Sequence, residues 1–132
     1  MQETLFTKII NGEIPSHKIY EDDEVFAFLD IHPIQSGHTL VVPKNPVSEF
    51  QDLSDEEYDE LFKAVKKIAQ KIKEISGKQR VCSRIEGFDV PHAHIHLYPC
   101  NNPQEFYGSK DRLQEDIDHE ALAKMAQKLK LS

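Results

Sequence analysis

The stretch PHAHIHLYP, residues 91–99, decides the fold, because it places a histidine at every second position. Successive side chains of a β-strand point to opposite faces. We therefore expect one face with His92, His94, His96 and Tyr98, and the other with Ala93, Ile95 and Leu97. The apolar face can pack against helices, which leaves the row of imidazoles for chemistry or metal binding near neutral pH.

Length and composition predict a single domain in the cytoplasm. A chain of 132 residues can bury a core without disulfides or a structural metal. The net charge of −7 argues against a nucleic-acid partner, which would need clustered Lys and Arg. Cys82 and Cys100 are too far apart for a CxxC motif, and the N-terminus MQETLFTKII lacks a signal-peptide pattern. No apolar run is long enough to span a membrane, so we expect no membrane partner.

Hydrophobic periodicity and turn signals predict an α+β fold. Strands are expected over residues 18–21, 25–30, 38–43, 80–86 and 93–98, and helices over 4–12, 54–76 and 120–129. The helix over 54–76 is the clearest element, because Ser54 and Glu57 form a capping box and Gly77 follows its end. Residues 101–116 have no regular pattern and are expected to be loop.

Two kinds of chemistry fit the histidine row. His92, His94 and His96 could ligate zinc, although three alternate residues of one strand lie along a line and converge poorly on one ion. Alternatively, one imidazole attacks phosphorus while its neighbours bind the phosphate oxygens, and the middle residue, His94, is best placed for the attack. The residues alone leave both possibilities open.

The chain resembles the histidine-triad nucleotide-binding (HIT) superfamily, in particular its Hint-like branch. Residues 92–98 match the signature His-x-His-x-His followed by two apolar-type positions, and the segment from Leu5 to Lys44 is similar to the opening of that branch. The resemblance spans most of residues 4–99. It implies a HIT-like fold, with a mostly antiparallel five-stranded sheet, a long helix and short terminal helices. It also implies one domain over 1–132, in which 101–132 is a C-terminal extension.

The resemblance also implies a site for a nucleoside monophosphate. His94 matches the nucleophile that forms a nucleotidyl-histidine, His96 a phosphate contact, His92 the residue whose backbone orients the nucleophile, and His38 an accessory histidine. Asp30 matches the acid that receives the ribose hydroxyls. The apolar slot for the purine is matched by Leu5, Phe6, Phe28, Ile31 and Leu40.

The function so implied is that of a purine-nucleotide hydrolase or nucleotidyl transferase. It would cleave the α-phosphate bond of nucleoside phosphoramidates or related conjugates, with no metal and no cofactor, as a cytoplasmic homodimer. Two alternatives stay open at this point: a nucleotide-binding regulatory module with little turnover, and a zinc-dependent hydrolase that uses the histidine row.

Three positions depart from the resemblance. Relatives often carry Gln, a hydroxyl residue and Asn four, three and eleven residues before the first histidine, where this chain has Phe88, Asp89 and Val81. If the loop lies beside the scissile bond, Asp89 also belongs to the nucleotide site and its charge disfavours polyphosphate leaving groups. We then expect a preference for amines, above all cationic ones.

Overall fold

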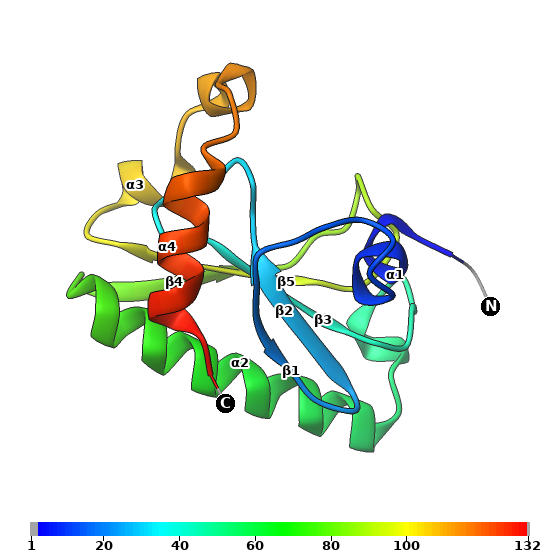
Figure 1. Cartoon of the computed structure of the whole chain (residues 1–132). Coiled ribbons are helices and arrows are strands. Elements are labelled where there is room, and N and C mark those ends of the chain that lie inside the picture. Colours follow the sequence, from blue (N-terminus) through cyan, green and yellow to red (C-terminus); the bar gives the residue numbers. More distant parts are fainter. Residues whose placement is uncertain (1–2, 132) are drawn as a thin grey trace.

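The computed structural model describes residues 3–131 (Figure 1). Its helices are α1 (Leu5–Ile10), α2 (Asp55–Ser76), α3 (Pro103–Tyr107) and α4 (His119–Leu129), with short 3-10 turns η1 (Phe50–Asp52) and η2 (Lys110–Gln114). Its strands are β1 (Lys18–Glu21), β2 (Val25–Leu29), β3 (Thr39–Pro43), β4 (Arg80–Arg84) and β5 (Ile95–Cys100). The predicted α+β class with a five-stranded sheet is confirmed.

All neighbouring strands of the sheet are antiparallel, in the order β1-β2-β3-β5-β4. β1 and β4 are therefore the two edges, and β5 is an inner strand between β3 and β4. In this register Leu40 of β3 and Arg84 of β4 both lie opposite His96 of β5. The first half of the chain thus reaches the histidine motif through β3, and the residues before the motif reach it through β4.

The two faces of the sheet have different partners. Ile95 and Leu97 point to the face covered by α2 and α4, where they join the main core with residues such as Leu61 and Ile68. The other face holds a second cluster, in which Phe6 and Ile9 of α1 pack on β2 and β3. Figure 1 shows α2 along one side of the sheet, with α1 near the opposite end from α4. The histidines lie on the face away from α2.

Helix termini follow the local sequence closely. α2 begins after Ser54, whose side chain accepts a hydrogen bond from the Glu57 N–H, while the Glu57 carboxylate accepts from the Ser54 N–H. It ends at Gly77, whose φ of 65° is the left-handed conformation that favours glycine. α1 begins in the same way, with a capping box between Thr4 and Thr7. The predicted long helix is therefore confirmed, capping box included.

The expected strand over 93–98 was wrong at its start. β5 begins at Ile95, so that His96 is the only triad histidine within the strand. The backbone just before it follows another path, because the His92 N–H donates to Val90 O and the Ala93 N–H donates to Val47 O. His92 and His94 therefore stand on an ordered loop that enters the strand.

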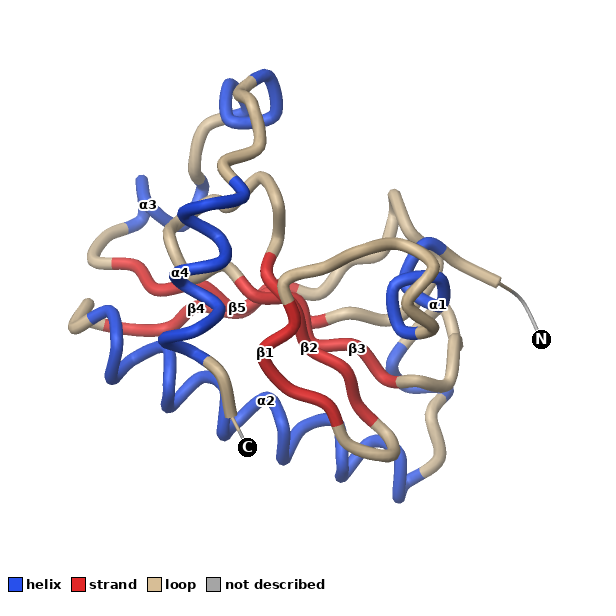
Figure 2. The backbone as a smooth tube through the Cα atoms, in the orientation of Figure 1, coloured by secondary structure: helices blue, strands red, loops and turns tan. Residues whose placement is uncertain are grey.

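The expected loop over 101–116 was also wrong. It contains α3, which begins with Asn102 as N-cap and Pro103 in its first turn, and the 3-10 turn η2. Both are too short to produce the periodicity on which the prediction depended. Figure 2 shows this segment as short helical pieces joined by loop, leading back to α4.

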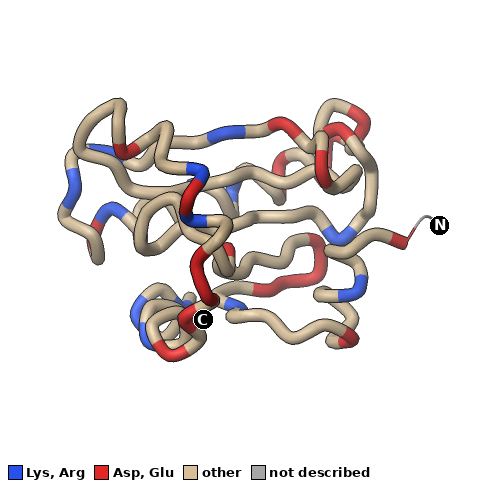
Figure 3. Tube along the Cα trace, turned by 90° about the horizontal axis from the view of Figure 1, so that it is seen from above, with Lys and Arg blue, Asp and Glu red and all other residues tan. Residues whose placement is uncertain are grey.

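The distribution of charged residues and the hydropathy of the helices agree with what the composition predicts about nucleic acids and membranes. Figure 3 shows Lys and Arg scattered along the trace among Asp and Glu, without a continuous basic stripe in that view. Within residues 3–131, no helix has the length and apolar character needed to cross a membrane.

Candidate active site

The four histidines predicted for the site lie close together and are buried. His38 and His92 are 1% and 0% exposed, and His94 and His96 are 5% and 7% exposed. The rings of His94 and His96 meet edge to face with centroids 4.9 Å apart, and those of His38 and His96 lie 5.2 Å apart. Each buried ring nitrogen needs a partner, and these partners fix where the protons are.

His92 is held by two hydrogen bonds. Its Nε2–H donates to the carbonyl oxygen of Pro43 at 2.7 Å, because that oxygen can only accept. In the neutral ring Nδ1 is then an acceptor, and the Thr4 hydroxyl donates to it at 2.7 Å. Thr4 is also the N-cap of α1 and accepts from the Thr7 N–H. The first turn of α1 is thereby attached to the triad.

His94 is oriented by the backbone of His92. Its Nδ1–H donates to the His92 carbonyl oxygen at 2.7 Å. With the proton of the neutral ring on Nδ1, the lone pair is on Nε2, which is the nitrogen left for a nucleophilic attack. The Phe6 ring meets the His94 ring edge to face at 4.9 Å, which restricts its orientation further.

His96 has its ring proton on the other nitrogen, Nε2, because a chain of hydrogen bonds ends at its Nδ1. The Ile34 N–H, which can only donate, donates to Nδ1 of His38 at 3.0 Å. The proton of His38 is therefore on Nε2, from which it is donated to Nδ1 of His96 at 2.9 Å. His96 then carries its own proton on Nε2. Nε2 of His94 thus presents a lone pair, and Nε2 of the neighbouring His96 presents an N–H donor.

Burial and neighbouring charges keep the rings of His38, His92 and His96 neutral. Burial lowers the pKa of His38 to about 2, with further lowering from His96, Arg84 and Arg112. Burial also lowers the pKa of His96 to about 4, followed by the charges of His94 and Arg84. The pKa of His92 is lowered mainly by burial. Near pH 7 the hydrogen-bond directions given above for these three rings therefore hold.

The apolar residues predicted for the base line one cavity of about 260 Å³. Phe6, Phe28 and Leu40 are buried at its floor. Leu5, from α1, and Ile31, after β2, are 47% and 42% exposed. Two exposed apolar side chains on either side of a buried floor suit a flat aromatic ring.

Asp30 lines the same cavity and has capacity for a ligand. Its Oδ1 accepts from the His32 N–H at 2.8 Å, and its Oδ2 lies 3.7 Å from Nε2 of His38. Burial raises the pKa of the carboxyl, and the His32 N–H and the charge of Arg112 oppose this shift. The side chain remains 22% exposed, so the free lone pairs can accept hydroxyl hydrogen bonds.

The loop before the triad differs from the expectation. Phe88 is 92% exposed, and Asp89 is exposed as well. The acidic group beside the triad is Glu86, whose carboxylate lies within 4.8 Å of ring nitrogens of His94 and His96. Its Oε1 accepts from the backbone N–H groups of Gly87 and Phe88. The role assigned to Asp89 stays a prediction, and Glu86 was missed.

The position found by counting eleven residues back from the motif lies away from the triad on β4. Val81 lies opposite Pro99, three residues along β5 from His96, whereas Arg84 lies opposite His96 itself. The length of the loop between β4 and β5 decides this register, and a fixed count of eleven residues does not include it. Arg112 of η2 was missed too, since its segment was expected to be loop.

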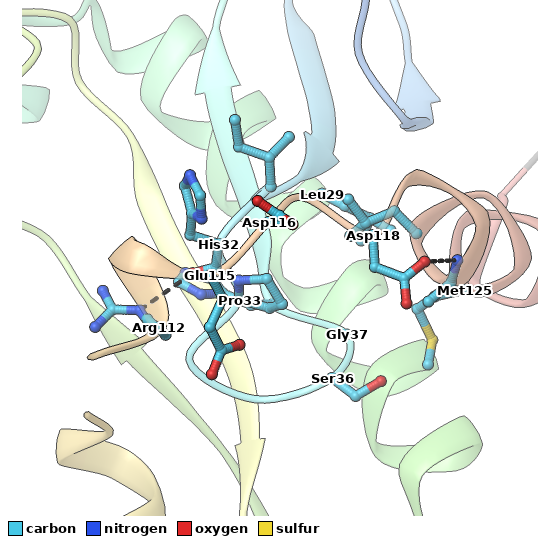
Figure 4. Close-up of a pocket in the computed structure, with 14 residues that line it drawn as sticks. Leu29, His32, Pro33, Ser36, Gly37, Arg112, Glu115, Asp116, Asp118 and Met125 are labelled. Carbon is cyan, nitrogen blue, oxygen red and sulfur yellow. Dashed lines mark hydrogen bonds between the residues drawn. The ribbon is translucent and has the colours of Figure 1, made fainter. Parts of the chain in front are cut away.

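Arg112 borders a second cavity, of about 270 Å³, which His38 also lines (Figure 4). In this close-up Arg112 and His32 lie side by side, joined by the bond from Nε of Arg112 to the His32 carbonyl oxygen at 3.1 Å. Acidic side chains from residues 115–118 line the same cavity.

Within the described residues, two groups of side chains could hold a metal ion. Asp30, His38 and His96 form one group, and Glu86, His94 and His96 form the other. Both need His96, whose Nδ1 accepts from His38 and whose Nε2 carries a proton. A metal ion at His96 would therefore have to displace a proton or a buried hydrogen bond, which disfavours the zinc alternative.

Comparison with known proteins shows to which family the chain belongs. The sequence profile of the HIT domain matches residues 11–102. This chain belongs to the HIT family. A HIT-like protein of Methanocaldococcus jannaschii is 44% identical over 99 residues, 72% of this chain and 77% of that relative. The adenosine 5'-monophosphoramidase of Schizosaccharomyces pombe is 38% identical over 105 residues, 79% of this chain and 77% of the relative.

The HIT-family fold extends over nearly the whole chain. The crystal structure of a HIT-like protein of Bartonella henselae has a TM-score of 0.78 and 32% identity, and the match covers 96% of this chain and 94% of that one. The C-terminal segment beyond residue 102, which the HIT profile does not match, is thus largely included in the structural match.

Proposed function

We propose that this HIT protein is a nucleotide hydrolase or nucleotidyl transferase. It would cleave the α-phosphate bond of purine nucleoside phosphoramidates or related conjugates through a nucleotidyl-histidine intermediate. The observation that carries the proposal is the opposite polarity of His94 and His96, a lone pair beside a donor, at the end of an apolar slot. The phosphoramidase activity for which the S. pombe relative is named supports the substrate class.

The residues divide the reaction among them. The lone pair on Nε2 of His94 forms the N–P bond, and the electrons of the bond to the leaving group depart with that group. Nε2–H of His96 donates to the phosphate or to the departing atom, where negative charge develops. Water then attacks phosphorus, gives up a proton and returns the lone pair to His94. Asp30 accepts from the ribose hydroxyls while the purine lies in the slot.

A rapid-quench experiment tests the proposal. The protein is mixed with an adenosine phosphoramidate labelled at the α-phosphate, beside adenylate and guanylate conjugates with other leaving groups. We expect released monophosphate and a labelled protein intermediate that is absent in His94→Ala. His119→Ala, a histidine on α4 that contacts His17, is the matched control and keeps both signals. Tight nucleotide binding without released monophosphate would favour the regulatory module instead.

We also propose a cytoplasmic homodimer. β4 is an edge strand of mixed polarity, and pairing would remove its exposed edge. Tyr58 and Ile75 of α2 are 41% and 36% exposed, so the long helix also offers exposed apolar side chains. Sedimentation should give a dimer at micromolar concentration, and a monomer up to millimolar concentration would refute the pairing.

A further inference from the structure

Arg84 is a cationic side chain beside the triad without a partner for one of its donors. It lies opposite His96 in the antiparallel pair of β4 and β5, so both side chains leave the same face of the sheet. Its Nε is buried and has no hydrogen-bond partner. A buried donor of a charged group that lacks an acceptor is costly, and a bound anion would supply the acceptor.

Arg112 reaches the same region from a different part of the chain. It lies in η2, beyond residues 11–102 that match the HIT profile. Its Nε donates to the His32 carbonyl oxygen, and its Nη1 donates to the Ser109 carbonyl oxygen at 3.0 Å. Neutral carbonyls fix the guanidinium without cancelling its charge. Among residues 3–131, no ion pair includes Arg84 or Arg112.

The two arginines act on the same rings. After burial and His96, both charges lower the pKa of His38. After burial and His94, both also lower the pKa of His96. Their positions agree with this, because Arg84 lies opposite His96 on β5, and Arg112 lines one cavity with His38. Two carboxylates lie close to these rings: Glu86 beside His94 and His96, with two backbone N–H groups bound to its Oε1, and Asp30 beside His38 and His96.

We propose that Arg84 and Arg112 form a subsite for an anionic group carried by the leaving group of the substrate. This inference rests on the proposed function, because the subsite adjoins the α-phosphate held at His94 and His96. The anion is either a carboxylate on the amine of a phosphoramidate or the next phosphate of a nucleotide anhydride. The preference is opposite in sign to the one expected from Asp89, whose side chain is exposed.

A matched pair of substrates tests the carboxylate. The adenosine phosphoramidates of phenylalanine and of phenylalaninamide differ only in one negative charge. We expect wild-type kcat/KM to be about tenfold higher for the phenylalanine conjugate, since charge-assisted hydrogen bonds to guanidinium are strong. In Arg84→Gln and Arg112→Gln the ratio should fall toward one, with the amide conjugate little changed. Arg80→Gln, the same change on an exposed residue of β4, is the control and keeps the ratio.

A binding experiment tests the phosphate and separates this inference from the proposed function. We expect ADP to bind about tenfold more tightly than AMP by calorimetry, and Arg84→Gln to remove the difference. If no conjugate is hydrolysed but this difference is found, the proposed function fails and the subsite stands. If only the phenylalanine conjugate is preferred, the anion is a carboxylate; if only ADP is preferred, the anion is the next phosphate. The subsite is overturned if the wild type shows equal kcat/KM for the two phenylalanine conjugates and equal affinity for ADP and AMP. It is also overturned if the arginine variants lose as much kcat/KM or affinity for the neutral member of each pair as for the charged one.

Discussion

Two hydrogen-bond arms enter the triad from opposite sides and leave its two reactive histidines in opposite states. The His92–His94 arm starts at the Thr4 hydroxyl and the Pro43 carbonyl and ends in a free lone pair on His94. The His38–His96 arm starts at the Ile34 N–H and ends in a donor on His96. The difference shows that backbone groups decide the chemistry, since the residue type is the same in both: the accepting His92 carbonyl leaves His94 a lone pair, and the donating Ile34 N–H leaves His96 a donor.

Removing the end of the first arm should have the largest effect. His94→Ala deletes the nucleophile at the edge of a cavity, and we expect hydrolysis of an adenosine phosphoramidate to fall by about 10³-fold or more. AMP binding, measured by calorimetry, should change little, because the slot and Asp30 remain. Activity near that of the wild type would show that the lone pair of His94 is not used.

The second arm should make the fold sensitive to acid. Folded His38 and His96 have pKa values lowered from 6.5 to about 2 and about 4, so the unfolded chain binds more protons below pH 6.5. Stability should therefore fall as the pH decreases through this window, by about 2 kcal/mol for each ring at pH 5. The raised pKa of Asp30 acts in the opposite direction.

His96→Asn isolates one ring, because the Asn oxygen can replace Nδ1 as the acceptor from His38. Urea unfolding at pH 8 and pH 5 should show a loss about 2 kcal/mol smaller in this variant than in the wild type. Parallel losses in the two proteins would mean that His96 is not held neutral by the fold.

The attachment of the first arm to α1 should have a smaller effect on catalysis. Thr4→Val removes the hydroxyl that donates to His92, and we expect kcat to fall by about tenfold through a misplaced His94. Thr4→Ser keeps the hydroxyl and should restore kcat. Thr7→Val breaks the capping box but leaves the His92 contact, so it should lower the melting temperature without the same loss of kcat. Equal kcat losses in Thr4→Val and Thr7→Val would assign the effect to the helix cap alone.

Removal of metal ions should have no effect on hydrolysis if the histidines of both arms keep their ring protons and bind no metal. A metal ion at His96 would compete with the bond from His38. Hydrolysis should therefore continue after extended dialysis against EDTA. Activity that is lost in EDTA and recovered on addition of zinc would revive the zinc hydrolase.

The sequence by itself determined the sheet, the long helix and the identity of the four histidines. The short apolar runs of β2 and β3, the alternation of apolar residues and histidines that leads into β5, and the capping box of α2 are local patterns that can be found in the sequence. The apolar slot followed from resemblance, and the structure brings all its predicted residues to one cavity with Asp30.

Only the tertiary structure decided the protonation pattern and the charges around the triad. Thr4 and His92 are 88 positions apart, and Arg112 and His32 are 80 positions apart. Such contacts depend on how α1 and η2 pack against the sheet, and no local periodicity reports them. Likewise, the loop between β4 and β5 sets the register that brings Arg84, and not Val81, opposite His96. Tautomers follow from hydrogen-bond partners, so a motif of three identical side chains acquires distinct roles only once the chain has folded.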